Sequence, residues 1–155
     1  MERFRHLVIA IVSQFVLGPT PEASAADRYG IAGPVAAEIL RIVDGDTILV
    51  NARPWPQQTV EVLIRIRGID APEIRARCAA IRMAAREAKA HLAQLLPASG
   101  TVFLTNVSGD KYFGRVVADV FLEDGSNPAQ EMIAAGLALP YDGGRKPAAA
   151  CHAGG

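Results

Sequence analysis

The spacing of apolar residues changes along this chain, and the order of these changes constrains the fold more than any other feature. From residue 60 to 67 aliphatic residues occupy every second position, while Arg65 and Arg67 occupy the opposite face, which is the pattern of a strand with one buried side. From residue 79 to 96 apolar residues recur at helical spacing, and Pro97 and Gly100 end that pattern. The sequence thus predicts a strand followed by an amphipathic helix.

Four further segments have strand character: 37–43, 47–50, 101–107 and 115–122. The first two flank Asp44-Gly45, a strong signal for a tight hairpin turn. A turn around Gly109 and Asp110 separates the last two. We therefore expect one hairpin before the strand at 60–67 and a strand pair after the helix.

A second, shorter helix completes the pattern. Asn127 can cap it, with Pro128 at its first position and Gly136 near its end. The order is then three strands, a helix, two strands and a helix, which provides too few helices for a doubly wound parallel sheet. It predicts an α+β fold, a five-stranded β-barrel of the OB type with two or three helices.

The first residues are typical of an export signal. Arg3 and Arg5 precede the apolar stretch 7–18, and the small residues Ala23-Ser24-Ala25 follow it. A helix of that length reaches roughly 18 Å, well short of the ~30 Å hydrocarbon core of a bilayer. We expect residues 1–25 to be a cleaved signal peptide, with an uncleaved anchor as the alternative, and the mature protein to be periplasmic or secreted without stable membrane association.

The chain that remains suits one compact domain. We assign residues 26–34 to a flexible lead-in, 35–142 to the domain and 143–155 to a Gly/Ala-rich tail, and we expect a monomer. The 16 basic and 16 acidic residues cancel, so net charge does not indicate a nucleic-acid-binding protein. The segment 65–89 has a local excess of bases, which either contact with a polyanion or a solvated helix face would explain.

The two cysteines, Cys78 and Cys151, both remain after cleavage of the signal peptide. In an oxidising compartment such a pair is more often a disulfide than a redox or metal site, so we predict a Cys78–Cys151 bridge. Two free thiols are one alternative. A weak metal pair of Cys151 with His152 is another, although it has too few ligands for a zinc site.

Three short motifs contain residues suited to phosphate chemistry. They are Asp44-Gly45-Asp46-Thr47, Gly68-Ile69-Asp70-Ala71-Pro72-Glu73, and Asp110-Lys111-Tyr112-Phe113-Gly114-Arg115. The first two supply carboxylates, the oxygen ligands that a hard cation such as Ca²⁺ requires. Each motif taken alone also fits an ordinary turn with solvated side chains.

Together, in this order, the three motifs resemble those of the staphylococcal nuclease (thermonuclease) family. That family has an Asp-Gly-Asp-Thr hairpin, an arginine-bearing strand that ends in Asp-x-Pro-Glu, and a Tyr-Gly-Arg turn. The likeness covers roughly residues 36–142 and includes the helix between the second and third motifs. It implies an OB-fold nuclease that uses Ca²⁺ to hydrolyse DNA and/or RNA.

The resemblance also implies a metal site. Asp46 and Asp70 match the family's metal carboxylates, and Ala71 matches the position whose backbone carbonyl binds the metal. Asp44 matches an acid in the outer shell of the metal. Residue 71 is alanine where the family's best-known member has threonine, a mild departure because the ligand there belongs to the main chain.

The remaining matches concern the substrate. Arg65 and Arg115 match the family's phosphate-binding arginines, and Glu73 matches its proposed general base. The residues at the nucleotide-binding positions are Lys111, Tyr112 and Tyr141. The third motif departs from the family by an inserted Phe113, which leaves Arg115 assignable and leaves the contacts of Lys111 and Tyr112 open.

A non-catalytic OB module that binds nucleic acid or protein is the main alternative. Such modules use basic grooves and exposed aromatic residues. Here aromatic residues make up only 6% of the chain. Without a metal, the cluster of acids in the first two motifs would repel phosphate. Both observations favour catalysis.

Overall fold

The computed structural model of the chain describes residues 30–96 and 100–144. The elements in chain order are β1 (Val35–Ile42), β2 (Thr47–Arg53), β3 (Val60–Ile66), β4 (Gly68–Asp70), α1 (Ala79–Leu95), β5 (Thr101–Gly109), β6 (Arg115–Phe121), α2 (Pro128–Ala134) and β7 (Leu139–Tyr141). All five predicted strands and both predicted helices are present. Two strands of three residues, β4 and β7, are additions to the predicted order.

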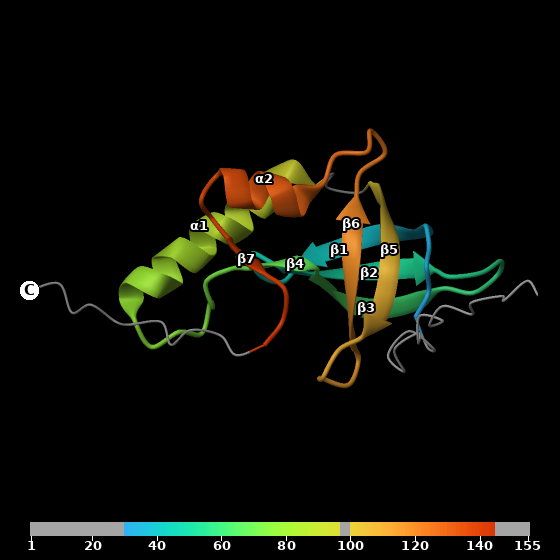
Figure 1. Cartoon of the computed structure of the whole chain (residues 1–155), viewed down its shortest axis with the longest axis horizontal. Coiled ribbons are helices and arrows are strands. Elements are labelled where there is room, and N and C mark those ends of the chain that lie inside the picture. Colours follow the sequence, from blue (N-terminus) through green and yellow to red (C-terminus); the bar gives the residue numbers. More distant parts are fainter. Residues whose placement is uncertain (1–29, 97–99, 145–155) are drawn as a thin grey trace, which may run out of the picture.

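Five strands form a closed barrel in the order β1-β2-β3-β6-β5 (Figure 1). Neighbouring strands run antiparallel except β3 and β6, which are parallel, and pairing of β1 with β5 closes the ring. Closure leaves the barrel itself without a free edge strand. The prediction of an OB-type barrel with helices is confirmed.

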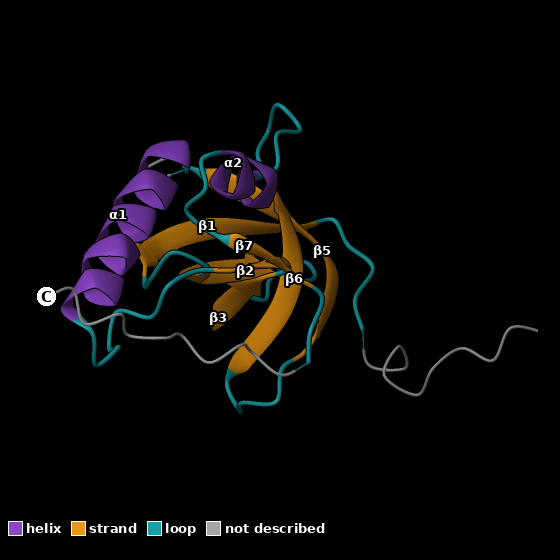
Figure 2. Ribbon diagram, turned by 60° about the vertical axis from the view of Figure 1, so that its left-hand side comes forward, coloured by secondary structure: helices purple, strands orange, loops and turns teal. Residues whose placement is uncertain are grey.

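The barrel interior is filled by aliphatic residues at alternate strand positions. Ile64 and Ile66 of β3 are buried, as the alternation predicts, whereas Val60 at the open end of the same strand is 44% exposed. Helix α1 contributes Leu92 and helix α2 contributes Met132 to the same core. Both helices lie on one side of the barrel (Figure 2).

The small sheet of β4 and β7 ties the end of the domain to the strand that carries the second motif. Its two strands are antiparallel, with Gly68 opposite Tyr141 and Asp70 opposite Leu139. Strands this short have no readable period, so their pairing depends on tertiary contacts alone. The consequence is that Tyr141, remote in sequence, lies beside the end of β3.

Several sequence predictions concern residues that lie outside the described ranges. The signal peptide 1–25, most of the tail and Cys151 are among them, so export and the Cys78–Cys151 bridge stay predictions. In the lead-in, Ile31 forms an antiparallel bridge with Val107. Within residues 30–96 and 100–144, no helix has the length and apolar character needed to cross a membrane.

Candidate active site

The turn between β1 and β2 fixes the first acidic motif. Backbone N–H groups of Val43 and Asp44 both donate to the carbonyl oxygen of Thr47, at 2.9 and 3.2 Å. Asp44 Oδ1 accepts from the N–H of Asp46 at 3.2 Å, and Thr47 Oγ1 donates to Asp46 Oδ1 at 3.0 Å. The carboxylate of Asp46, a residue only 6% exposed, is thereby held in one orientation.

Gly45 in this turn is required for space. A Cβ at this position would lie 2.8 Å from the Cβ atoms of both Ala71 and Ala88, closer than such atoms approach. Ala88 belongs to α1 and Ala71 to the second motif, so the turn packs directly against both. The sequence interpretation, which ascribes this glycine to turn formation, misses the packing requirement.

We expect Gly45→Ala to lower the free energy of unfolding by about 1–3 kcal/mol, the usual cost of forcing a methyl group into a filled site. Gly109→Ala is the matched control, because a Cβ there meets nothing within 4 Å. Urea unfolding of both variants measures the difference. Equal stability of the two would contradict the packing role of Gly45.

The second motif meets the first through Arg65. Its Nη1 lies 3.1 Å from Asp46 Oδ2, and its Nη2 donates to Asp70 Oδ1 at 3.0 Å. The N–H of Ala71 donates to Asp46 Oδ2 at 2.8 Å. Arg65 lies on the outer face of β3, yet it is buried because the β1–β2 turn, β4 and Tyr141 of β7 surround it.

Two carboxylates and one guanidinium in a buried cluster leave an excess of negative charge. Burial raises the pKa of Asp46 from 3.8 to about 6, although Arg65 and the Ala71 N–H act to lower it. Burial makes the ionised carboxylate costly, and a positive partner offsets that cost. This corner of the molecule is therefore suited to attract a further cation.

This raised pKa gives a pH-dependent contribution to stability. As the pH falls, Asp46 takes up its proton at a higher pH in the folded protein than in the unfolded chain, so protonation of Asp46 stabilises the folded state. This contribution is fully present below about pH 4 and is lost as the pH rises through about 6. We expect Asp46→Asn in chelator to gain up to about 3 kcal/mol over the parent between about pH 4 and pH 7. Urea unfolding across this range measures the gain, and a difference independent of pH would contradict it.

The third motif forms a separate cationic arrangement. Arg115 Nε donates to Asp110 Oδ2 at 2.5 Å, and its guanidinium carbon lies 4.7 Å from the centre of the Tyr112 ring. Burial acts to raise the pKa of Asp110, but Arg115 and the backbone N–H groups of Lys111 and Tyr112 outweigh it and hold that pKa below its usual value. Within the described residues, the two terminal nitrogens of Arg115 have no hydrogen-bond partner and are not buried. They remain open to a ligand.

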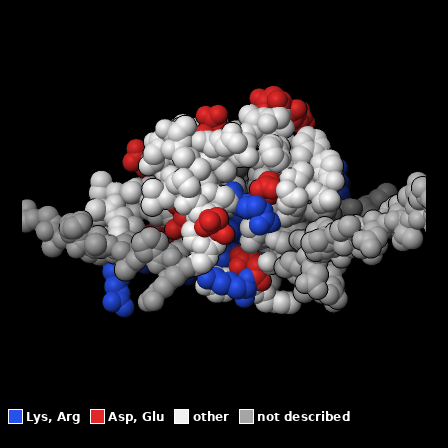
Figure 3. Space-filling model, viewed as in Figure 1, with Lys and Arg blue, Asp and Glu red and all other residues white. Residues whose placement is uncertain are grey.

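Both arrangements face one cleft of about 1350 Å³. Among the predicted site residues, those that line it are Asp44, Asp46, Arg65, Glu73, Lys111, Tyr112, Arg115 and Tyr141. Asp70 accepts a hydrogen bond from Arg65, which lines the cleft. Ala71 is buried and donates its N–H to Asp46, which also lines the cleft. Figure 3 shows blue basic atoms at the centre of this face with red acidic atoms beside them. The structure brings together residues that the sequence separates by almost 100 positions.

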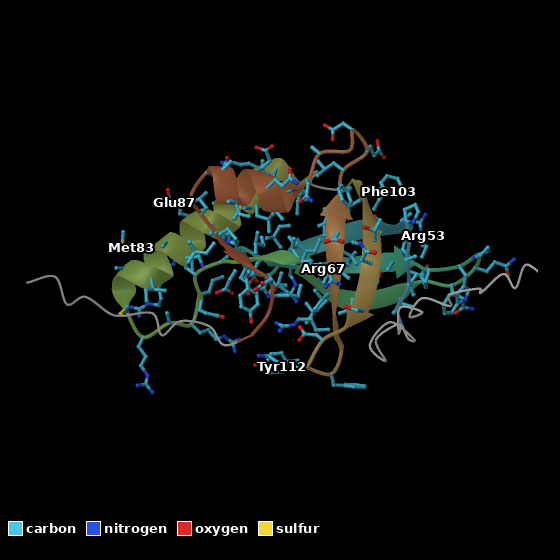
Figure 4. The ribbon with its side chains drawn as sticks, in the orientation of Figure 1. Arg53, Arg67, Met83, Glu87, Phe103 and Tyr112 are labelled. Atoms are coloured by element: carbon cyan, nitrogen blue, oxygen red, sulfur yellow. The ribbon has the colours of Figure 1, made fainter. Side chains whose placement is uncertain are left out.

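The structure adds residues to which the sequence analysis gave no role in the site. Asp110 holds Arg115, and Thr47 holds Asp46; both belong to the quoted motifs, which was the available signal. Arg67, labelled in Figure 4, also lines the cleft and forms hydrogen bonds with the irregular part of β5. Its Nη2 donates to Asn106 O, Ser108 Oγ and Val117 O at 2.6, 3.0 and 3.3 Å. The period-two spacing that placed Arg67 on the same strand face as Arg65 was the available signal.

The donor set suits a hard cation only in part. Asp46 and Asp70 provide carboxylate oxygens that converge on the same guanidinium, and among the described residues neither histidine nor cysteine lines the cleft. Among the described residues, no group of three or more histidine, cysteine, aspartate or glutamate side chains is placed to hold a metal. Two carboxylates fit Ca²⁺ only if backbone carbonyl oxygen and water complete its shell.

Comparison with known proteins identifies the family of this chain. A model of the family described as staphylococcal nuclease homologue matches residues 63–151, more than half of the chain. The chain belongs to the staphylococcal nuclease family. Two proteins named "Uncharacterized endonuclease", from Escherichia coli and Escherichia coli O157:H7, are each 31% identical over 142 residues, which cover 92% of this chain and 75% of theirs.

Family membership confirms that the chain is a thermonuclease-like nuclease, a hydrolase of phosphodiester bonds. The matched residues begin inside β3 and extend beyond the described part of the chain, whereas the resemblance of the motifs spans roughly 36–142. They include Arg65, Asp70 and Arg115. They do not include the β1–β2 turn, so the tertiary structure, and not the family match, is what places Asp46 beside Arg65.

Proposed function

We propose that this protein is an exported, calcium-dependent endonuclease that hydrolyses DNA and/or RNA. The observation that carries the proposal is the convergence of Arg65, Arg115 and Glu73 on the cleft that also contains Asp46. A phosphodiester is an anion whose charge increases at the oxygens during attack by water, so positive groups fixed at one place lower the barrier. The word endonuclease in the names of the two relatives supports internal cleavage.

Three side chains of the protein have different roles in cleavage. Arg115, held at Nε by Asp110, offers its two terminal nitrogens to two phosphate oxygens in the paired geometry of a guanidinium. Arg65 donates to the same phosphate in competition with Asp46 and Asp70. Glu73, exposed on the cleft wall, takes the proton of the attacking water, a step that contributes about 10²–10⁴-fold in rate.

Asp46 and Asp70, with the backbone carbonyl of Ala71, are the residues that would hold Ca²⁺. When bound, the ion supplies a Lewis acid for the charge that develops on the phosphate. Asp44 orients Asp46 through the backbone hydrogen bond between them. Lys111, Tyr112 and Tyr141 line the rest of the cleft and contact the nucleotide.

Digestion of labelled substrates tests the proposal. The mature chain is incubated with single- and double-stranded DNA and RNA in Ca²⁺, in Mg²⁺ or in excess chelator. We expect cleavage with Ca²⁺ and its loss in chelator, because the ligands are all oxygen atoms. Full activity in chelator would contradict calcium dependence. Binding of oligonucleotides without cleavage under every condition would instead support a non-catalytic binding module.

Export is a separate part of the proposal and rests on the sequence of residues 1–25. We expect the protein recovered from outside the cytoplasm to begin at Ala26. N-terminal sequencing checks this, and a retained Met1 on that material would contradict cleavage.

A further inference from the structure

The turn between β5 and β6 presents an aromatic ring for which the proposed mechanism has no use. The N–H of Arg115 donates to the carbonyl oxygen of Tyr112 at 3.3 Å, and Gly114 has φ +80°. A four-residue turn with a positive φ at its third position is a type II turn, and Phe113 is its second residue. The Phe113 side chain at this corner is fully exposed, at 109% of the reference area.

The neighbouring ring is already engaged, whereas that of Phe113 is available. The Tyr112 ring has the Arg115 guanidinium 4.7 Å from its centre and Lys111 Nζ at 5.1 Å. Within the described residues, no cation lies over the Phe113 ring. A flat molecule that stacks on this turn would therefore meet Phe113 first.

Location distinguishes Phe113 from other exposed apolar residues. A single exposed aromatic residue is common on soluble proteins and by itself indicates nothing. Trp55, 57% exposed in the β2–β3 loop, is such a case and does not line the cleft. Phe113 follows Lys111 and Tyr112, both of which line it, at the turn where Figure 4 labels Tyr112. Phe113 does not itself line the cleft, but it lies in the turn between Tyr112 and Arg115, which both do.

We propose that Phe113 is a stacking platform for one unpaired nucleobase of the substrate strand, beside the phosphate bound by Arg115. The inference rests on the proposed nuclease function and adds a substrate class to it. Every base has a face that stacks on an aromatic ring, so the contact is independent of sequence. In a duplex that face is covered by neighbouring base pairs, so the platform favours single-stranded or locally opened nucleic acid.

Charge near the turn agrees with a strand that passes over it. Lys111 is exposed one residue before Tyr112, and a lysine there can neutralise a neighbouring phosphate. The acid of the turn, Asp110, is occupied by Arg115 and by the N–H of Lys111. The outer surface of the turn thus offers the Phe113 ring, over which no described cation lies, and the cation of Lys111, which suit the base and a phosphate of a nucleotide.

Equilibrium binding of fluorescent oligonucleotides tests the platform. All variants carry Glu73→Gln to slow cleavage, are the full mature chain, and are measured in Ca²⁺ with a short oligothymidylate and with an abasic oligomer of equal length. Because one stacked base contributes about 1–3 kcal/mol, we expect Phe113→Ala to weaken oligothymidylate binding about 5- to 150-fold. Binding of the abasic oligomer should not change, and Phe113→Trp should preserve the parental affinity.

Matched variants separate base stacking from a general loss of affinity. Trp55→Ala removes an exposed aromatic residue outside the cleft and should bind as the parent does. Equal affinity of the folded Phe113→Ala variant and the parent would overturn the proposal, as would equal weakening for both oligomers. If the Glu73→Gln protein binds neither oligomer, and the protein with Glu73 intact cleaves no nucleic acid, the proposed function itself fails. If the protein with Glu73 intact cleaves nucleic acid and Phe113→Ala does not change oligonucleotide affinity, only the platform is overturned.

Discussion

Replacement of Arg115 by lysine should lower the single-turnover cleavage rate about 10²–10³-fold, the cost of losing one preorganised donor at a charge that develops in the transition state. Lysine keeps the positive charge but loses the planar fork and the Nε that Asp110 holds. Oligonucleotide affinity should change much less, since the interaction strengthens as the reaction proceeds. Single-turnover kinetics together with equilibrium binding measure the two effects.

Two comparisons make the Arg115 result specific. Arg53→Lys is the matched control, because Arg53 lies on the exposed surface of β2 and pairs only loosely with Glu38, at 3.9 Å. Glu73→Gln should also slow turnover while affinity stays nearly intact. A folded Arg115→Lys protein that binds poorly but cleaves bound substrate at the parental rate would show that Arg115 only holds nucleic acid.

Arg65→Lys should slow cleavage to a similar extent, but this variant also needs a stability measurement. Arg65 is 9% exposed and lies against both Asp46 and Asp70, so a shorter cation there leaves buried carboxylates less well paired. Thermal melting separates this loss from the kinetic effect. Arg115, with its open terminal nitrogens, is therefore the more decisive of the two arginines.

The second large effect should follow loss of a cation ligand. We expect Asp46→Ala and Asp70→Ala each to weaken Ca²⁺ binding by more than about 100-fold, since even residues that only support a ligand cost 10- to 100-fold. Turnover should fall in parallel. Isothermal titration of the nucleic-acid-free protein with Ca²⁺ measures the affinity directly and does not depend on activity.

Asp124→Ala is the matched control, because Asp124 is an exposed acid in the loop between β6 and α2, outside the cleft that contains Asp46. Its removal changes the net charge by the same amount and should leave Ca²⁺ affinity unaltered. An Asp46→Ala or Asp70→Ala protein with parental affinity for Ca²⁺ is not missing a ligand, and the metal site would then need other oxygens.

The sequence by itself determined the elements of the barrel and indicated several of the residues that line the cleft. Period-two and helical spacing are local properties, so β3 and α1 were predictable within a residue or two. Asn127, which accepts from the N–H of Ala129 at 2.9 Å, marked the start of α2 for the same local reason. The ordered motifs likewise indicated Arg65, Glu73 and Arg115 through resemblance to a family.

Only the tertiary structure decided how these residues meet. The sequence did not indicate that β7 pairs with β4, that Gly45 packs against Ala71 and Ala88, or that Arg65 joins Asp46 to Asp70. Apart from the pair Arg65 and Asp70, these contacts join residues more than 15 positions apart in the chain, and their geometry depends on the folded barrel. The raised pKa of Asp46 has the same origin, because burial is a property of the folded molecule and no local sequence pattern specifies it.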